Sequence, residues 1–153
     1  MNLFGEIEYC YSHLDEAGKN GKIAAKKTSN GIAAENLVVA DLFIRGHEAV
    51  VFGGADTDII AIIDGEIVRL QVKTSANLNF GAATHQSKNG RDLLSYRDKI
   101  EGFAFVYLLR RAVYYIHPLA INAGTLTIPQ SHWGRQHCDD SFNEFLRRLA
   151  AGV

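Results

Sequence analysis

The sequence predicts an α/β domain, because helical and strand patterns alternate along its 153 residues. A helical pattern over residues 31–45 precedes an apolar hairpin over residues 58–73, and a second helical pattern lies at about 141–150. A chain of this length most often forms one domain with one hydrophobic core. We therefore expect a β-sheet that is flanked by helices.

The first of these helices follows a segment with little periodicity. Short helices are expected there at about 3–16 and 21–28, and Ser29 or Asn30 can cap the longer helix that begins near Gly31. Its expected end is Arg45-Gly46, a basic residue followed by a C′ glycine. We therefore divide the chain into an N-terminal extension, residues 1–29, which serves as an arm or an oligomerisation segment, and a single domain, residues 30–153.

The expected strands follow from β-branched runs and turn residues. Asp64-Gly65 separates two such runs and favours a tight hairpin turn. Residues 75–95 are polar and form the expected mobile loop. The pattern Ser141-Phe142-Asn143-Glu144 is a capping box, which predicts the start of the last helix. The other expected strands lie at 49–52, near 78–82, at 103–109 and 112–116 around Arg110-Arg111, and at 126–128.

Three polar side chains interrupt the apolar hairpin. Asp58 opens its first strand, and Gln71 and Lys73 lie two residues apart on its second, so these two share one face. Buried polar groups cost free energy, so this patch is a candidate functional site. The structural alternatives are a buried Asp58–Lys73 ion pair and a Gln71 that only satisfies backbone groups. Asp56 is a second acid nearby, but its glycine-rich turn favours a loop role.

The composition excludes several classes of protein. The hydrophobic fraction is 47% and the charged fraction 22%, as in ordinary globular domains. No apolar run is long enough to span a membrane, and the N-terminus does not resemble a signal peptide. Two cysteines do not make a disulfide framework, so we expect reduced thiols and a cytoplasmic protein.

Charge is uneven along the chain although its net value is only −1. An acidic head is followed by four lysines with no acid between them. This basic cluster is either a solvated segment or an arm that contacts phosphate. Its residues are Lys19, Lys22, Lys26 and Lys27.

A zinc site is a weaker alternative reading of the cysteines and histidines. Their spacing matches no standard ligand pattern. The residues that such a site would use are Cys10, His13, His132, His137 and Cys138.

Several motifs occur together in one order and spacing over about residues 30–121. In this respect the chain resembles the PD-(D/E)XK nuclease superfamily, and within it a small group that includes a group I intron homing endonuclease type and carries a Gln-x-Lys motif. The motif residues are Gly31 and Glu35, Gly46, Asp58-Ile59-Ile60, Gln71-Val72-Lys73-Thr74, Tyr96 and Ile100-Glu101-Gly102-Phe103-Ala104. The chain departs from the superfamily at three positions: Thr57 replaces a proline, Gln71 an acid and Gly102 an aromatic residue.

The resemblance implies a restriction-endonuclease-like mixed β-sheet flanked by helices, and metal-dependent hydrolysis of DNA at a specific site or structure. Asp58, Gln71 and the Val72 carbonyl would hold Mg²⁺, for which Mn²⁺ can substitute. Glu35 would hold the metal through water, although it also suits the first turn of a helix. Lys73 would orient or deprotonate the attacking water. A neutral Gln71 predicts weak metal binding without the DNA phosphate.

The implied partner is DNA, and cleavage of both strands needs two active sites, so we expect a homodimer or a larger symmetric assembly. A catalytically silent nucleic-acid-binding or regulatory protein of the same fold is the second hypothesis, and an unrelated structural or interaction domain is the third. The expected DNA contacts are Lys19, Lys22, Lys26, Lys27, Ser75, Lys88 and Arg91.

Overall fold

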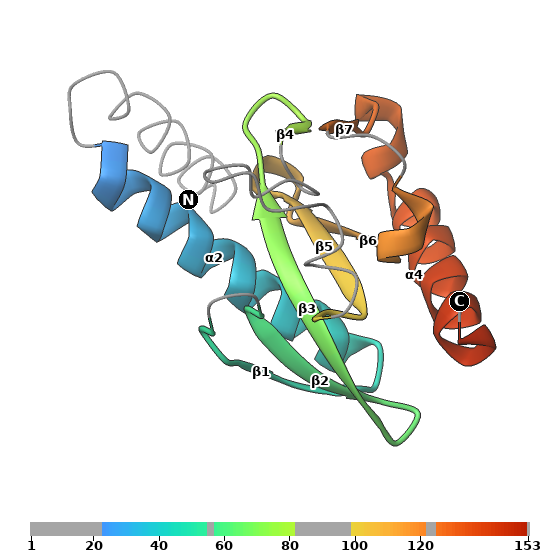
Figure 1. The fold of residues 1–153 in the computed structure, drawn as a ribbon. Helices are drawn as coiled ribbons and strands as arrows, with labels where there is room; N and C mark the ends of the chain where they lie inside the picture. Colours follow the sequence, from blue (N-terminus) through green and yellow to red (C-terminus); the bar gives the residue numbers. More distant parts are fainter. Residues whose placement is uncertain (1–22, 55–56, 82–98, 122–124, 153) are drawn as a thin grey trace, which may run out of the picture.

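The computed structural model describes residues 23–54, 57–81, 99–121 and 125–152. Figure 1 shows its helices beside a twisted sheet. No helix within these ranges is long and apolar enough to cross a membrane. The elements are α2 (Ile23–Ile44), β1 (Glu48–Val51), β2 (Ile59–Ile63), β3 (Glu66–Thr74), β4 (Asn79–Gly81), β5 (Gly102–Tyr107), η2 (Leu108–Arg110), β6 (Ala112–Ile116), η3 (Pro118–Ala120), β7 (Thr125–Thr127), η4 (Gln130–Trp133) and α4 (Arg135–Ala151).

The main sheet has five strands in the order β1-β2-β3-β5-β6. β3 and β5 run parallel, with Leu70 opposite Gly102, and the other neighbours are antiparallel. β4 and β7 form a separate two-stranded sheet. The predicted mixed α/β fold is therefore confirmed, and so are the strands expected around both hairpins.

The β2–β3 hairpin forms as its sequence predicts. Asp64 and Gly65 both have positive φ, 52° and 86°, which is the pattern of a two-residue hairpin turn whose twist matches that of the strands. The register pairs Ile63 with Glu66 and Ile59 with Leu70. This register places Asp58 just beyond the paired part of β2.

The core is divided between the two faces of the sheet. Side chains from α2 and α4, among them Val38, Leu42 and Phe145, pack with Leu70 on one face. Alternate residues of β5 point to the other face, where Phe105 joins a second cluster that includes residues of β4 and η4. Burying a side chain of this size stabilises the fold by about 1.5–3 kcal/mol. Both helices therefore hold the same face of the sheet.

Helix α2 starts earlier than the sequence pattern predicts. It begins at Ile23 and passes through Asn30 and Gly31 without a break, so the expected cap at Ser29 or Asn30 is wrong. The alanines and lysines of residues 24–27 are good helix formers, and one interior glycine costs only about 1 kcal/mol. The C-terminus is as predicted: Gly46, at φ 88°, completes a motif in which two backbone N–H groups return to the last turn.

Helix α4 also starts earlier than expected, at Arg135 rather than near Ser141. Ser141 is buried inside the helix, where its hydroxyl donates to the Cys138 carbonyl and accepts from the Tyr115 N–H. The apparent capping box is therefore wrong. Ser141 instead links α4 to β6.

Gly102 explains one departure from the family pattern. A Cβ at this position would lie 2.5 Å from the Phe145 ring and 2.8 Å from a Leu70 methyl group. No side chain fits there while α4 packs this closely on β5. Gly102 is thus a packing residue in this chain.

Candidate functional site

Asp58 holds its place through backbone geometry. Its N–H donates to the Leu70 carbonyl at 3.0 Å and so extends the β2–β3 ladder by one bond beyond β2. Its carboxylate then accepts the next N–H of β3, that of Val72, at 2.7 Å. The side chain thus takes the place of a missing strand neighbour, which fixes the carboxylate against β3.

Gln71 binds the same carboxylate oxygen. Its Nε2 donates to Asp58 Oδ2 at 2.6 Å. The residue is 8% exposed, and its Oε1 is buried without a hydrogen-bond partner among the described residues. Leaving a buried acceptor unpaired costs about 1–3 kcal/mol. The site therefore contains an oxygen that is held in place and suited to a further ligand.

Glu35 and Lys73 complete an electrostatic cluster around Asp58. Burial, and then repulsion by Asp58, raises the pKa of Glu35. Burial also raises the pKa of Asp58, against the opposing effects of the Val72 N–H and Lys73. The pKa of Lys73 is lowered by burial in spite of Asp58. All three groups are thus shifted toward their neutral forms, a pattern that is frequent at functional sites.

The donor set of this cluster suits a hard cation. Carboxylate, amide and backbone carbonyl oxygens are the ligands of Mg²⁺ and Ca²⁺. Within the described residues no hydrogen bond reaches Asp58 Oδ1. The same residues contain no group of three or more His, Cys, Asp or Glu that could hold a metal, so Gln71 and the Val72 carbonyl would have to supply ligands.

The predicted DNA contacts are only partly described. Ser75 directs its hydroxyl at Asn77 Oδ1 and the Asn79 carbonyl, at 2.7 and 2.8 Å. It can donate to a phosphate only if these contacts open. Lys26 and Lys27 belong to the first turns of α2, and their side chains are not described. The positions outside the described residues are Lys19, Lys22, Lys88, Arg91 and the motif residue Tyr96.

The alternative zinc site receives no support from the described residues. The rings of His132 and His137 stack at 4.7 Å, and neither shares a metal-binding group with Cys138. Burial raises the pKa of the Cys138 thiol to about 11, which disfavours the thiolate that zinc requires. Cys10 and His13 lie outside the described residues.

Sequence reasoning missed the contacts that fix the surrounding elements. Arg69 donates its backbone N–H and its guanidinium to Glu101, which ties the entry of β5 to β3. Burial alone would raise the pKa of Glu101, but the bonds from Arg69 lower it. No short sequence signal pairs these residues, because the parallel register alone brings them together.

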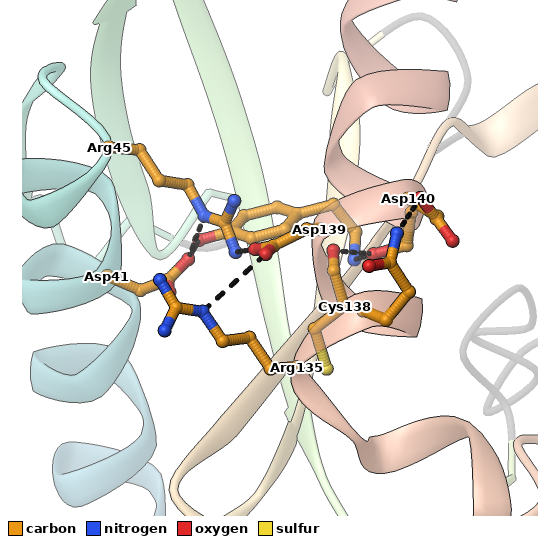
Figure 2. A network of polar contacts seen from close by, with 9 residues as sticks. Asp41, Arg45, Arg135, Cys138, Asp139 and Asp140 are labelled. Atoms are coloured by element: carbon orange, nitrogen blue, oxygen red, sulfur yellow. Dashed lines mark hydrogen bonds and ion pairs between the residues drawn. The ribbon is translucent and has the colours of Figure 1, made fainter.

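A second missed network joins α2, β6 and α4 (Figure 2). Asp41 Oδ2 accepts from the Tyr115 hydroxyl and from Arg45 Nε, both at 2.8 Å. Arg45 also reaches Asp139 on α4, at 2.9 Å. An acid within the apolar stripe of α2 was the one sequence signal for this network.

Comparisons with known proteins agree with the fold. No family model matches the chain, and no curated protein matches it in sequence. Among solved structures, the chain is similar to a bacterial homing endonuclease, I-Ssp6803I, with 14% identity and a TM-score of 0.53. The match covers 80% of this chain and 92% of that one. At this identity the likeness concerns the fold alone, and it agrees with the predicted mixed α/β fold.

Proposed function

We propose that this protein is a metal-dependent DNA endonuclease, of a homing or otherwise site- or structure-specific type. The observation that carries the proposal is the Asp58–Gln71 pair, in which a fixed carboxylate lies beside a buried amide oxygen that has no partner in the described part of the chain. The fold of a homing endonuclease supports the same class. Such a donor set is difficult to explain by stability, because each of its members costs free energy.

In this proposal Asp58, Gln71 Oε1 and the Val72 carbonyl would hold Mg²⁺, and Glu35 would assist through water. The ion, when bound, neutralises charge on the phosphate and on the leaving oxygen. The protein supplies one full negative charge in direct reach, so DNA phosphate is needed to complete the binding. Metal affinity is therefore weak in the free protein.

Lys73 orients the attacking water and accepts a proton from it. Its lowered pKa increases the share of the neutral amine, which can act as a base. Asp58 limits this effect because its charge favours the ammonium form. Lys73 is thus suited to accept a proton from water when a bound cation offsets the charge of Asp58.

The test is cleavage of duplex, branched and single-stranded DNA with Mg²⁺ or Mn²⁺, by wild type and Asp58→Asn. We expect Asp58→Asn to lose metal binding and cleavage while its circular dichroism spectrum stays native. Asp64→Asn is the matched control, since it removes one carboxylate from the exposed hairpin turn, where asparagine tolerates the positive φ. An Asp58→Asn protein that cleaves at the wild-type rate refutes the proposal.

Two parts of the proposal depend on further measurements. Binding of DNA without cleavage under every metal condition would identify a catalytically silent member of the fold. The proposed homodimer or larger symmetric assembly is tested by sedimentation equilibrium with DNA present, which should give the mass of two or more protein chains on the DNA.

A further inference from the structure

A cavity of about 570 Å³ lies where the C-terminal half of α2, the turn between β5 and β6, and the start of α4 meet. It is separate from the Asp58 cluster. Among its lining residues, four are arginines and two are aspartates: Arg45, Arg110, Arg111, Arg135, Asp41 and Asp139.

The ionised groups of this cavity leave an excess of two positive charges. Arg45 is matched by Asp41 and Asp139, with which it forms short ion pairs. Arg110 and Arg111 form no ion pair within the described part of the chain. The cavity therefore offers guanidinium groups that no carboxylate of the described residues neutralises.

Arg135, the fourth of these arginines, lies at the rim of the cavity. Its side chain is 96% exposed, and it reaches Asp139 only at 3.8 Å (Figure 2). The Cys138 thiol in the same wall stays neutral, because burial raises its pKa to about 11. No negative charge from the thiol therefore reduces the excess.

Arg111 occupies a backbone position that arginine seldom takes. Its φ of 49° and ψ of 42° lie in the left-handed region, where glycine or asparagine is preferred. Its N–H closes the η2 turn on the Leu108 carbonyl. The strained conformation places two consecutive arginines at the tip of a short connection beside the cavity.

We propose that this cavity binds a backbone phosphate of the DNA strand that is cut at the Asp58 cluster, an inference that rests on the proposed function. Arginine forks match the geometry of phosphate oxygens. Six residues of α2, a rise of about 9 Å, separate Glu35 from Asp41. Helix α2 thus contributes a residue to each place, and a DNA strand offers a phosphate about every 3.4 Å along its axis.

The test compares two double variants of the full chain. Arg110→Ala with Arg111→Gly removes both free arginines, and glycine suits the positive φ at the second position. Arg147→Ala with Arg148→Ala is the matched control, because it removes the same charge from the exposed Glu144 pairs of α4. DNA affinity is measured by fluorescence anisotropy in metal-free buffer over a range of KCl concentrations, after both variants are shown to melt cooperatively.

We expect the cavity variant to bind DNA about tenfold more weakly and to lose about 1.8 units of slope in log K against log salt, for two phosphate contacts. The control should stay within twofold of wild type in affinity. In cleavage assays with Mg²⁺, the cavity variant should lose more in KM for DNA than in kcat, because its changes remove contacts to DNA and none of the Asp58 cluster.

Equal affinity and slope in the two variants overturn the inference and leave the nuclease proposal standing. If only the cavity variant loses affinity for DNA and the wild-type protein cleaves no DNA, the cavity is a DNA-binding site but the protein is not a nuclease. Inorganic pyrophosphate is titrated by calorimetry as a separate arm. If it binds at the cavity while both variants bind DNA equally, the ligand is a free phosphate compound and the DNA assignment is wrong.

Discussion

Gln71→Glu tests the central pair of the site most directly. The substitution keeps the size and shape of the side chain, but it replaces the Nε2 donor with an acceptor. Asp58 Oδ2 then loses its 2.6 Å hydrogen bond and faces a second carboxylate, while it keeps the Val72 N–H. The variant also introduces the acid that is usual in the nuclease superfamily that the chain resembles. We expect opposite effects on stability with and without Mg²⁺.

The size of the effect in metal-free buffer follows from two terms. A hydrogen bond to a charged group contributes about 1.5–3 kcal/mol. Two carboxylates about 4 Å apart repel each other by about 4 kcal/mol at an effective dielectric constant of 20. The two carboxylates can share a proton, which makes the total loss smaller than the sum of these two terms. We therefore expect the free energy of unfolding to fall by about 3 kcal/mol at pH 8. This corresponds to a fall in Tm of about 6–12 °C for a domain of this size.

Mg²⁺ should reverse the effect of Gln71→Glu on stability. The second carboxylate is an additional anionic ligand, and each 1.4 kcal/mol of differential binding is about a tenfold change in Kd. The assay is differential scanning fluorimetry in EDTA and in increasing Mg²⁺. The variant should melt below wild type in EDTA and gain more Tm per decade of Mg²⁺.

A charge swap separates the pair from a general loss of stability. In Asp58→Asn with Gln71→Glu, the new amide can donate to the new carboxylate, so a single negative charge and one amide donor remain. We expect the swap to recover about 2 kcal/mol of the loss as a coupling energy. Gln130→Glu adds the same charge at an exposed position and serves as the control.

Two results would refute this reasoning. One is a Gln71→Glu variant that melts at the wild-type temperature in EDTA. The other is a swap that is no more stable than the sum of its two single changes predicts, which would mean that the pair does not act as a unit.

Four further predictions follow from the same structure. Lys73→Ala should abolish cleavage but keep DNA affinity within about threefold, because it removes one of many phosphate-proximal charges; an active variant would exclude Lys73 as the base. Burial, followed by the nearby carboxylate of Asp58, raises the pKa of Glu35, so the fold favours its protonated form. The contribution of this protonated form to the free energy of unfolding is therefore full below pH 4.5. It is lost as the pH rises through the higher pKa of the folded state. Glu35→Gln should therefore flatten the fall in the free energy of unfolding above pH 4.5, as measured by urea denaturation. Gly102→Ala should cost about 1–3 kcal/mol by overpacking against Phe145, whereas Gly134→Ala, where a Cβ meets nothing within 4 Å, should be near neutral. Combined alanine substitution of the basic cluster should lower the salt slope of DNA binding, and an unchanged slope would reduce the cluster to a solvated segment; the four positions are Lys19, Lys22, Lys26 and Lys27.

The β2–β3 hairpin was predictable because its determinants are local. Two β-branched runs and Asp64-Gly65 specify the strands, the turn and the register together, and the register brings Asp58 next to Gln71. The approximate positions of the other strands were predictable from β-branched runs and turn residues, but their order in the sheet was not. The mixed sheet followed from the family resemblance, since no local pattern in the chain states that β3 and β5 are parallel.

The helix starts were not predictable from capping residues, since a residue type that favours a cap can also lie inside a helix. Asn30 and Ser141 both have the residue types of helix caps, yet both lie inside helices. Ser141 satisfies its hydroxyl within α4 and holds a β6 N–H, a partner that no nearby sequence specifies. A better signal for α4 was the apolar spacing of Cys138, Phe142 and Phe145, which continues the helical face upstream of the false cap.

The long-range polar contacts were equally inaccessible to sequence reasoning. Arg69 and Glu101 are 32 residues apart, and Tyr115 and Asp41 are 74 residues apart. Each pair forms because two elements that are distant in sequence are neighbours in the sheet or across it. The candidate site could be predicted because most of it lies within one hairpin, whereas its supports come from the whole fold.

The energetics of the site, like its geometry, favour a bound ligand. The carboxylates of Glu35 and Asp58 have raised pKa values, and Gln71 Oε1 is buried without a partner among the described residues, so all three groups destabilise the fold when no ligand is bound. A divalent cation that binds oxygen would relieve each of these costs, and the same charge would lower the pKa of Lys73 further. Binding that stabilises the acids thus also produces the neutral amine that can accept a proton from water. A purely structural Asp58–Lys73 ion pair would show no such coupling, because a cation would have to compete with Lys73 for Asp58 and would raise the free energy of unfolding little.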